Sequence, residues 1–206
     1  MAGSSPVSLT IMEPIVLASG SLRRQEYFRL LGLPFNIMPA KLDERPRPGQ
    51  TPDDYTRDMA VRKINAILDQ LQGRVPRWIC GADTVISVGG EIFGKPSDRG
   101  EAKTMIERLQ GRKHVVSTSV ALFSGKNQNI DCRTVRAEIC FAPLSENEVE
   151  WYLNTGEWQG AAGSYKIQGL GGCFAVSIKG SYSAVVGLPM HEFYRMLIEN
   201  GYQYGP

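Results

Sequence analysis

The sequence predicts an α/β protein with a mixed β-sheet and flanking helices, arranged in two lobes. Three observations support this class. The chain has 206 residues, which suits one domain or a tightly fused pair. Hydrophobic residues make up 42% and charged residues 21%, as in ordinary globular proteins with a buried core. Strand–helix units also alternate with β-hairpins along the chain, and that order is typical of sheets that mix parallel and antiparallel strands.

The first elements follow an extension. Residues 1–13 show no regular pattern, so we expect a flexible N-terminal extension before one domain spanning 14–206. A short apolar run at 15–19 predicts a strand. After a glycine turn, Ser21 can cap a helix that continues to about Leu31.

The middle of the chain combines a long helix with a long strand. Three prolines make residues 43–52 a loop. Apolar residues at helical spacing then predict a helix over 53–71. Residues 78–88 are typical of a strand with a polar interruption, and a Gly-Gly turn leads from it to a short partner strand at 91–93.

The second half predicts two more helices around a long hairpin, and a late loop. Ser97 or Asp98 caps a helix that ends at Gly111, and Ser145 with Glu148 forms a capping box at the start of the next helix. The long Gly-rich loop is a candidate for function, because such loops are uncommon in compact domains. The remaining expected elements are strands over 114–124 and 133–142, the loop over 156–172, a strand over 173–179 and a helix over about 190–199.

Charge and hydropathy exclude several classes of protein. Lys plus Arg number 23 and Asp plus Glu 21, so the net charge of +2 argues against a general nucleic-acid binder and a polybasic membrane binder. No run approaches 18 apolar residues, so we expect no membrane span. The first ten residues also lack the pattern of a secretory signal. We therefore expect a cytoplasmic protein.

Four cysteines are present, and none forms a C-x-x-C pair; they are Cys80, Cys132, Cys140 and Cys173. Three of them fall in apolar, strand-like segments. Reduced core thiols are therefore favoured over a disulfide or a metal site. His114 and His191 have no Cys or His at ligand spacing, which argues against structural zinc.

The segment from Ser19 to Arg24 places two arginines in the first turn of a predicted helix. Cations are disfavoured there by roughly 0.3–1 kcal/mol each, because the helix dipole is positive at that end. An anion bound by the backbone N–H groups, the serine hydroxyls and the guanidinium groups would reverse this effect. The alternative is that both arginines face solvent or pair with Glu26 or Glu44. The spacing excludes a P-loop.

A second group of polar residues suits phosphoanhydride chemistry. Asp83 stands in an apolar strand, where a carboxylate is costly unless it is paired or holds a metal. Glu44 starts the proline-rich loop, Lys63 interrupts the long helix near its apolar face, and Lys95 lies between Gly94 and a proline. Carboxylates that bind Mg²⁺, with lysines directed at phosphates, are what such chemistry requires. A purely structural Asp83–Lys95 pair is an equal alternative.

Gln168 is the candidate for base recognition in the late loop. Its amide carries a donor and an acceptor together, and a uracil or thymine edge offers the complementary pair. On these residues alone, a flexible glycine loop in which Gln168 caps a turn is the favoured reading.

Together these segments resemble a known family. Residues 17–24 (LASGSLRR) resemble L-A-S-x-S-P-R-R, the opening signature of the Maf-like nucleotide pyrophosphatases. Leu22 replaces the usual proline, and Ile64-Asn65 replaces the usual alanine after Lys63. Each block alone is weak, but together in this order they are specific and extend over about 14–199. The six later matching blocks are Asp43-Glu44, Lys63, residues 81–85, 94–96, 162–169 and 187–189.

The resemblance implies a mixed α/β fold related to inosine triphosphatase, with a cleft between its lobes. It also implies hydrolysis of a nucleoside triphosphate to the monophosphate and pyrophosphate with a divalent metal. One branch of the family acts on dTTP and UTP and the other on 7-methyl-GTP. Arg23, Thr84 and Gln168 match the dTTP/UTP branch. Homodimers are common in the family, so a homodimer is an expectation on the same ground.

The resemblance also implies roles for the site residues. Glu44 and Asp83 would hold Mg²⁺ or Mn²⁺, and Asp83 would also act as general base. Lys63, Lys95 and Arg24 would neutralise charge on the phosphate oxygens. Ser19 and Ser21 would hold phosphate at the helix end, while Arg23, Thr84 and Gln168 would select the base. The alternative activities are 7-methyl-GTP hydrolysis and non-catalytic nucleotide binding in the regulation of cell division; an intact set of Asp83, Lys63 and Lys95 argues against the second.

Overall fold

The computed structural model describes residues 12–204. Most of the expected flexible extension, residues 1–11, therefore lies outside the described part. Glu13, at the end of that expected extension, is bound to the domain: its carboxylate accepts a hydrogen bond from Trp78 Nε1 at 2.7 Å and its carbonyl accepts one from Tyr202 at 2.8 Å. Glu13 is therefore held against the domain by these two contacts.

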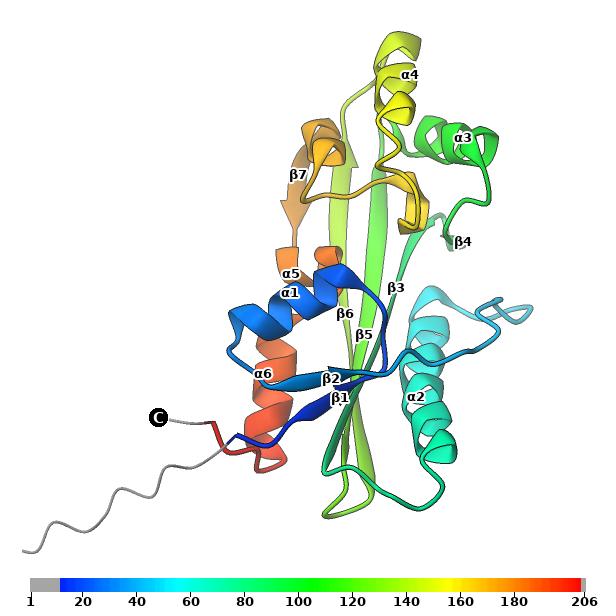
Figure 1. Cartoon of the computed structure of the whole chain (residues 1–206). Coiled ribbons are helices and arrows are strands. Elements are labelled where there is room, and N and C mark those ends of the chain that lie inside the picture. The colour runs from blue at the N-terminus through cyan, green and yellow to red at the C-terminus, as the bar shows by residue number, and fades with distance from the viewer. Residues whose placement is uncertain (1–11, 205–206) are drawn as a thin grey trace, which may run out of the picture.

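Seven strands form one mixed sheet, which confirms the predicted fold class (Figure 1). The order across the sheet is β2-β1-β3-β5-β6-β7, and β4 pairs with β3. The pairs of β1 with β2 and of β1 with β3 are parallel, and the remaining pairs are antiparallel. The strands are β1 (Ile15–Leu17), β2 (Phe35–Ile37), β3 (Trp78–Val88), β4 (Glu91–Phe93), β5 (Lys113–Ser124), β6 (Asn129–Phe141) and β7 (Ala175–Lys179).

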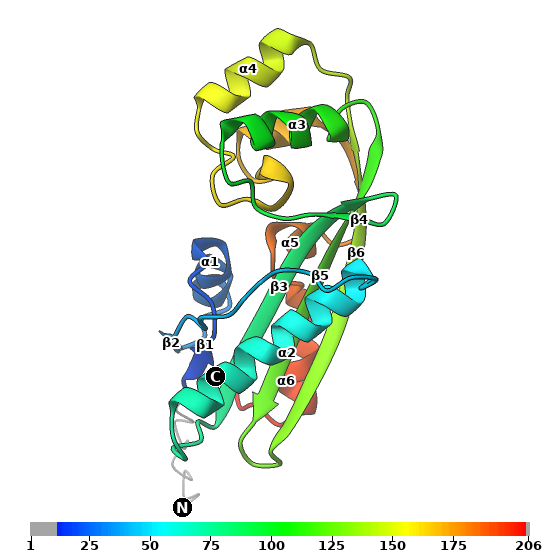
Figure 2. The ribbon, with the colours of Figure 1, turned by 90° about the vertical axis from the view of Figure 1, so that its right-hand side faces the viewer.

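Helices cover the sheet at both of its ends (Figures 1 and 2). At one end α2 lies on one face, and α1 and α6 lie on the other. At the other end α3, α4 and the late loop gather beside the sheet. None of the helices between residues 12 and 204 is long and apolar enough to cross a bilayer. The helices are α1 (Leu22–Leu30), α2 (Pro52–Gln70), α3 (Arg99–Leu109), α4 (Glu146–Asn154), α5 (Tyr182–Val186) and α6 (Met190–Glu199), with 3₁₀ turns η1 (Ala162–Ser164) and η2 (Leu170–Phe174).

The molecule has two lobes, as predicted, and they share the long strands β3, β5 and β6 (Figure 2). The lower lobe contains β1, β2, α1, α2 and α6. Its core is split by the sheet into one cluster around Trp78 and Phe193 and another around Ile64 and Ile79. The upper lobe contains α3, α4 and the late loop, packed around Phe141 and Tyr152. Two separate cores joined by continuous strands leave room for a cleft between the lobes.

Several element boundaries differ from the sequence prediction. Strand β6 begins at Asn129 instead of 133, because the turn needs only residues 125–128. Strand β7 begins at Ala175 instead of 173, since η2 occupies the preceding residues. The expected loop over 156–172 contains η1 and the first residues of η2. The sequence prediction missed β2 and α5, which have three and five residues and are too short to show periodicity.

Close packing of α2 on β3 depends on Gly81. A Cβ atom at this position would lie 2.2 Å from the carbonyl oxygen of Ala60 and 3.1 Å from Ile64 Cγ1. Such contacts are far shorter than packed atoms tolerate, so only glycine allows this approach. The approach brings Lys63, on the next turn of α2, against the neighbouring Asp83 of β3.

One edge of β3 is left open between two partners. Strand β1 pairs with it only up to Cys80, and β4 pairs with it only from Ile86. Because β5 occupies the opposite edge, the segment from Gly81 to Val85 has a gap in the sheet on this side. Side chains of a strand alternate between faces, so Asp83 and Thr84 point to opposite faces at the same gap.

Candidate active site

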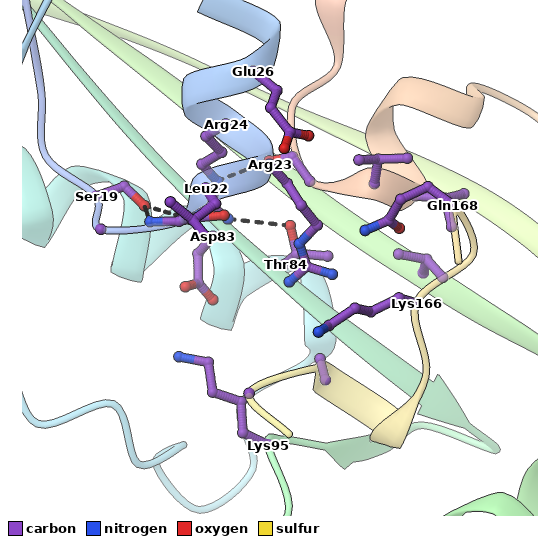
Figure 3. A pocket seen from close by; sticks show the side chains of 18 of the residues that line it. Ser19, Leu22, Arg23, Arg24, Glu26, Asp83, Thr84, Lys95, Lys166 and Gln168 are labelled. Carbon is purple, nitrogen blue, oxygen red and sulfur yellow. Dashed lines mark hydrogen bonds between the residues drawn. The ribbon is translucent and has the colours of Figure 1, made fainter. Parts of the chain in front are cut away.

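A cleft of about 650 Å³ lies between the lobes at this gap. Figure 3 shows that its side chains come from α1, β3, the segment after β4 and the late loop. The structure brings together in this one cleft all ten residues that the sequence analysis named: Ser19, Ser21, Arg23, Arg24, Glu44, Lys63, Asp83, Thr84, Lys95 and Gln168. Segments as far apart as residues 19 and 168 therefore form a single site.

Two lysines and two carboxylates form a continuous chain in the cleft. The Lys63 ammonium lies 2.6 Å from Asp83 Oδ1 and 3.1 Å from Glu44 Oε1. It also lies 3.5 Å from the carbonyl oxygen of Ala82. Lys95 contacts the other oxygen of Glu44 at 3.3 Å. The alternative of a structural Asp83–Lys95 pair is therefore wrong, because Asp83 pairs with Lys63 and Lys95 pairs with Glu44.

These ion pairs keep the Glu44 carboxylate charged. Partial burial raises the cost of its charge, but Lys63 and Lys95 together outweigh burial and lower the pKa of Glu44 below its usual range. Lys63 and Asp83 are buried, whereas the Glu44 side chain is 40% exposed. The Lys63 ammonium group thus contacts one buried carboxylate, Asp83, and one accessible carboxylate, Glu44.

The donor set suits a hard divalent cation. Glu44 and Asp83 each place an oxygen against Lys63 Nζ, so their carboxylates are neighbours. Mg²⁺ is usually held by one or two carboxylates and completes its shell with water and substrate phosphates. The described residues contain no group of three or more His, Cys, Asp or Glu that could hold a metal by themselves. A metal here would depend on substrate oxygens for the rest of its ligands.

The start of α1 leaves its backbone N–H groups available. Ser21 takes the predicted N-cap position, but its side chain makes no capping hydrogen bond. The Ser21 N–H instead donates to Ser19 Oγ at 3.3 Å. Ser21 therefore occupies the predicted N-cap position, but the predicted capping hydrogen bond is not formed. An unfilled helix N-terminus can accept an anion.

Arg24 is fixed by the protein itself. Its Nε donates to the Gly187 carbonyl at 2.9 Å, its Nη1 to Ser19 Oγ at 2.9 Å and its Nη2 to Thr84 Oγ1 at 3.3 Å. The side chain is buried, and burial lowers the pKa of the guanidinium, although Asp83 and other groups act in the opposite direction. Two of its five N–H donors remain for a ligand.

Arg23 is the less constrained of the two arginines (Figure 3). Burial lowers the pKa of its guanidinium, repulsion by Arg24 adds to this effect, and Glu26 opposes it. No ion pair joins either arginine to Glu26 or Glu44 within residues 12–204, and the buried Arg24 does not face solvent, so that alternative is wrong. Arg24 is buried and Arg23 is half-buried, and two adjacent guanidinium groups without a carboxylate partner favour a bound anion.

Thr84 belongs to a small hydroxyl network on the other face of β3. Its Oγ1 lies 2.9 Å from Thr118 Oγ1, which in turn lies 2.7 Å from the Ala184 carbonyl oxygen. Together with the bond from Arg24, these contacts fix the position of the hydroxyl. Thr84 can therefore act as an oriented polar group at the cleft wall.

Gln168 lies exposed at the mouth of the cleft, and its amide has no hydrogen-bond partner in the described chain. The reading in which it caps a turn is therefore wrong. The loop that carries it is held by Glu157, whose carboxylate accepts hydrogen bonds from the N–H groups of Leu170 at 2.9 Å and Gly171 at 3.0 Å. An anchored loop with a free amide suits recognition of a ligand edge.

The sequence analysis missed one cation of the cleft, Lys166. It lines the cleft and points into it from the late loop. The available signal was its position in the stretch Ser164–Gln168, two residues before the residue that was identified.

The cysteine prediction is confirmed in part. All four cysteines are free, but only Cys80 is buried, and Cys173 lies exposed in η2 instead of a strand. Burial raises the pKa of the Cys80 thiol to about 12, which makes it an inert core residue.

Comparisons with known proteins find relatives over most of the chain. The profile of the family described as Maf-like protein matches residues 14–200. The chain is 40% identical to a dTTP/UTP pyrophosphatase of Symbiobacterium thermophilum, over 93% of this chain and 96% of the relative. It is 41% identical to a dTTP/UTP pyrophosphatase of Hahella chejuensis, over 91% and 92% of the two chains.

Among solved structures, a Vibrio cholerae protein overlaps 71% of this chain and 72% of its own, with a TM-score of 0.32 and 10% identity. That overlap is too weak to support an argument. The family profile, in contrast, spans the whole cleft from Ser19 to Gln168, and the two relatives match more than nine-tenths of the chain. The chain belongs to the Maf-like protein family.

Proposed function

We propose that this protein hydrolyses dTTP and UTP to the nucleoside monophosphate and pyrophosphate. The observation that carries this proposal is the buried Asp83 paired with Lys63, which also contacts Glu44, in a cleft that also holds a helix N-terminus without a side-chain cap and two arginines. Such a site provides a carboxylate to activate water and several cations to receive a triphosphate. The names of the relatives support the choice of nucleotides.

In the proposed reaction, water attacks the α-phosphorus. Asp83 accepts its proton, and the bond from the α-phosphorus to the bridging oxygen of the β-phosphate breaks. Lys63, Lys95 and Arg24 stabilise the negative charge that develops on the phosphate oxygens, while Ser19, Ser21 and the N-terminus of α1 hold a phosphate group. A divalent cation, Mg²⁺ or Mn²⁺, held by Glu44 and Asp83, would neutralise further phosphate charge.

Base selection would come from Arg23, Thr84 and Gln168. The free amide of Gln168 can donate to a carbonyl oxygen and accept from N3–H of uracil or thymine. Thr84 and Arg23 line the same cleft as Gln168 and would restrict the position of the base. This division leaves catalysis to Asp83, on the opposite face of β3.

A pyrophosphate-release assay on a nucleotide panel, with and without Mg²⁺, tests the proposal. We expect release from dTTP and UTP that depends on the metal, and much less from 7-methyl-GTP. Preferred hydrolysis of 7-methyl-GTP would instead favour the other branch. Tight nucleotide binding without any release would favour a non-catalytic regulator.

Replacing Gln168 by Glu should lower kcat/KM for dTTP and UTP by about 5- to 150-fold. The ionised carboxylate can only accept hydrogen bonds, so one base carbonyl is left without a donor, at a cost of about 1–3 kcal/mol. Steady-state kinetics on dTTP, UTP and 7-methyl-GTP measure the effect. Gln70→Glu, at the exposed end of α2, is the control for the added charge. Equal ratios among the three substrates in Gln168→Glu and wild type would show that Gln168 does not contact the base.

We extend the proposal to a cytoplasmic enzyme that forms homodimers. Free cysteines in the described chain suit a reducing compartment. The dimer rests on the family resemblance, and light scattering of the purified protein would give its mass directly; a monomer at assay concentrations would contradict this part.

A further inference from the structure

Lys166 extends from the upper lobe into the cleft without a partner. No ion pair joins its ammonium group to any of residues 12–204, although the other lysines of the cleft, Lys63 and Lys95, are both paired with carboxylates. Figure 3 shows its side chain pointing toward Arg23, which comes from the lower lobe. Two cations from different lobes thus face one cleft with no carboxylate paired to either of them.

The backbone before Lys166 fixes this direction. Gly163 and Ser164 both have positive φ, of 63° and 66°. A left-handed conformation costs a non-glycine residue such as Ser164 roughly 1–2 kcal/mol, so its surroundings must hold it there. Gly163 packs so closely that an added Cβ would lie 2.6 Å from Ile86 Cδ1. Its N–H donates to the Gly94 carbonyl at 2.9 Å, which ties the late loop to the segment carrying Lys95.

Tyr165 completes the positioning of Lys166. Its ring is buried, and its hydroxyl lies 2.8 Å from Nε2 of the buried His114. Tyr165 has extended φ and ψ, of −141° and 158°, so the next side chain points the opposite way. Because Tyr165 points into the core of the upper lobe, Lys166 is directed into the cleft.

We propose that Lys166 binds a phosphate group of the substrate from the upper lobe, opposite Arg23 of the lower lobe. This inference rests on the proposed function, because it assumes a triphosphate in this cleft. An ammonium group is a compact point charge with three donors, which suits phosphate oxygens. A phosphate bound by Lys166 relieves the repulsion between its ammonium group and the guanidinium of Arg23, which keeps its proposed role in placing the base. The substrate would then contact both lobes at once.

The test measures binding of two fragments of the substrate by calorimetry. Methylene-bisphosphonate, which cannot be hydrolysed at its P–C–P bridge, represents the phosphates, and thymidine represents the base and sugar. We expect Lys166→Ala to weaken bisphosphonate binding roughly 10- to 100-fold, in line with loss of a charge-assisted hydrogen bond. Lys166→Arg should retain most of the affinity, and thymidine binding should not change.

Lys126→Ala is the matched control, since Lys126 is an exposed lysine in the turn between β5 and β6 at the far end of the sheet. Unchanged bisphosphonate affinity in Lys166→Ala would overturn the inference. Loss of thymidine binding alone would also overturn it and would assign Lys166 to the base. If wild type binds bisphosphonate through Lys166 but releases no pyrophosphate from dTTP, the proposed function fails while this contact stands.

Discussion

Asp83→Asn should lower kcat/KM for dTTP by roughly 10²- to 10⁴-fold, the usual effect of losing a general base. The amide has nearly the shape of the carboxylate but cannot accept the proton of the attacking water. It is also a weaker ligand for a divalent cation, so the loss of rate should reach the upper part of this range. Pyrophosphate release under single-turnover conditions measures the chemical step directly.

The same substitution should lower thermal stability only moderately. Removing one partner of a buried ion pair usually destabilises a protein because the other charge is left buried and unpaired. Here Lys63 retains its contacts with Glu44 at 3.1 Å and with the Ala82 carbonyl oxygen at 3.5 Å, so its buried charge still has partners. Thermal melting of Asp83→Asn should therefore still show one cooperative transition.

Asp69→Asn, at the exposed end of α2, serves as the control for an Asp-to-Asn change outside the cleft. It should leave both turnover and melting temperature unchanged. A folded Asp83→Asn protein with nearly wild-type turnover would contradict the role of Asp83 as proton acceptor. The cleft would then need another base.

Gly81→Ala should destabilise the fold by about 1–3 kcal/mol or more, because the added methyl group overlaps the backbone of α2. The distance of 2.2 Å to the Ala60 carbonyl oxygen cannot be relieved by rotating a side chain. For a chain of this length, such a loss lowers the melting temperature by about 2–4 °C per kcal/mol. Movement of α2 away from β3 should also lengthen the Lys63–Asp83 contact and lower kcat.

Gly94→Ala is the control for stability, because a Cβ there meets nothing within 4 Å. Its melting temperature should match that of wild type. If Gly81→Ala melts at the wild-type temperature as well, the packing of α2 on β3 is looser than the structure shows. Full activity in a destabilised Gly81→Ala protein would show that close packing of α2 on β3 is not required for catalysis.

The sequence predicted which residues line the cleft better than it predicted the contacts among them. All ten named residues line the cleft, because motifs in order along the chain identify which segments meet. The ion pairs among these residues could not be predicted from the order of the motifs. The period of α2 places Lys63 beside its apolar face, but the depth that Gly81 permits decides that Lys63 contacts Asp83.

Arg24 shows a second limit of reasoning from the sequence. Its position in the first turn of α1 indicates an anion site, and the absence of a side-chain cap at Ser21 is consistent with this. Its contacts with Gly187 and Thr84 join residues 163 and 60 positions away, and local sequence contains no information about such partners. Short elements such as β2 and α5 escaped prediction for a related reason, since tertiary contacts define them and periodicity does not.

The gap along β3 has a consequence for how this protein can change. Asp83 and Thr84 are adjacent in the chain, yet they serve different walls of the cleft because the open edge exposes both faces of one strand. A substitution at Thr84 alters the wall that faces Arg24, while the wall that faces Lys63 keeps its composition. Under the roles proposed for Thr84 and Asp83, the nucleotide preference can change on one face of β3 while the residues proposed for hydrolysis on the other face stay the same. A single inserted residue before Asp83 would exchange the two walls and remove both properties at once.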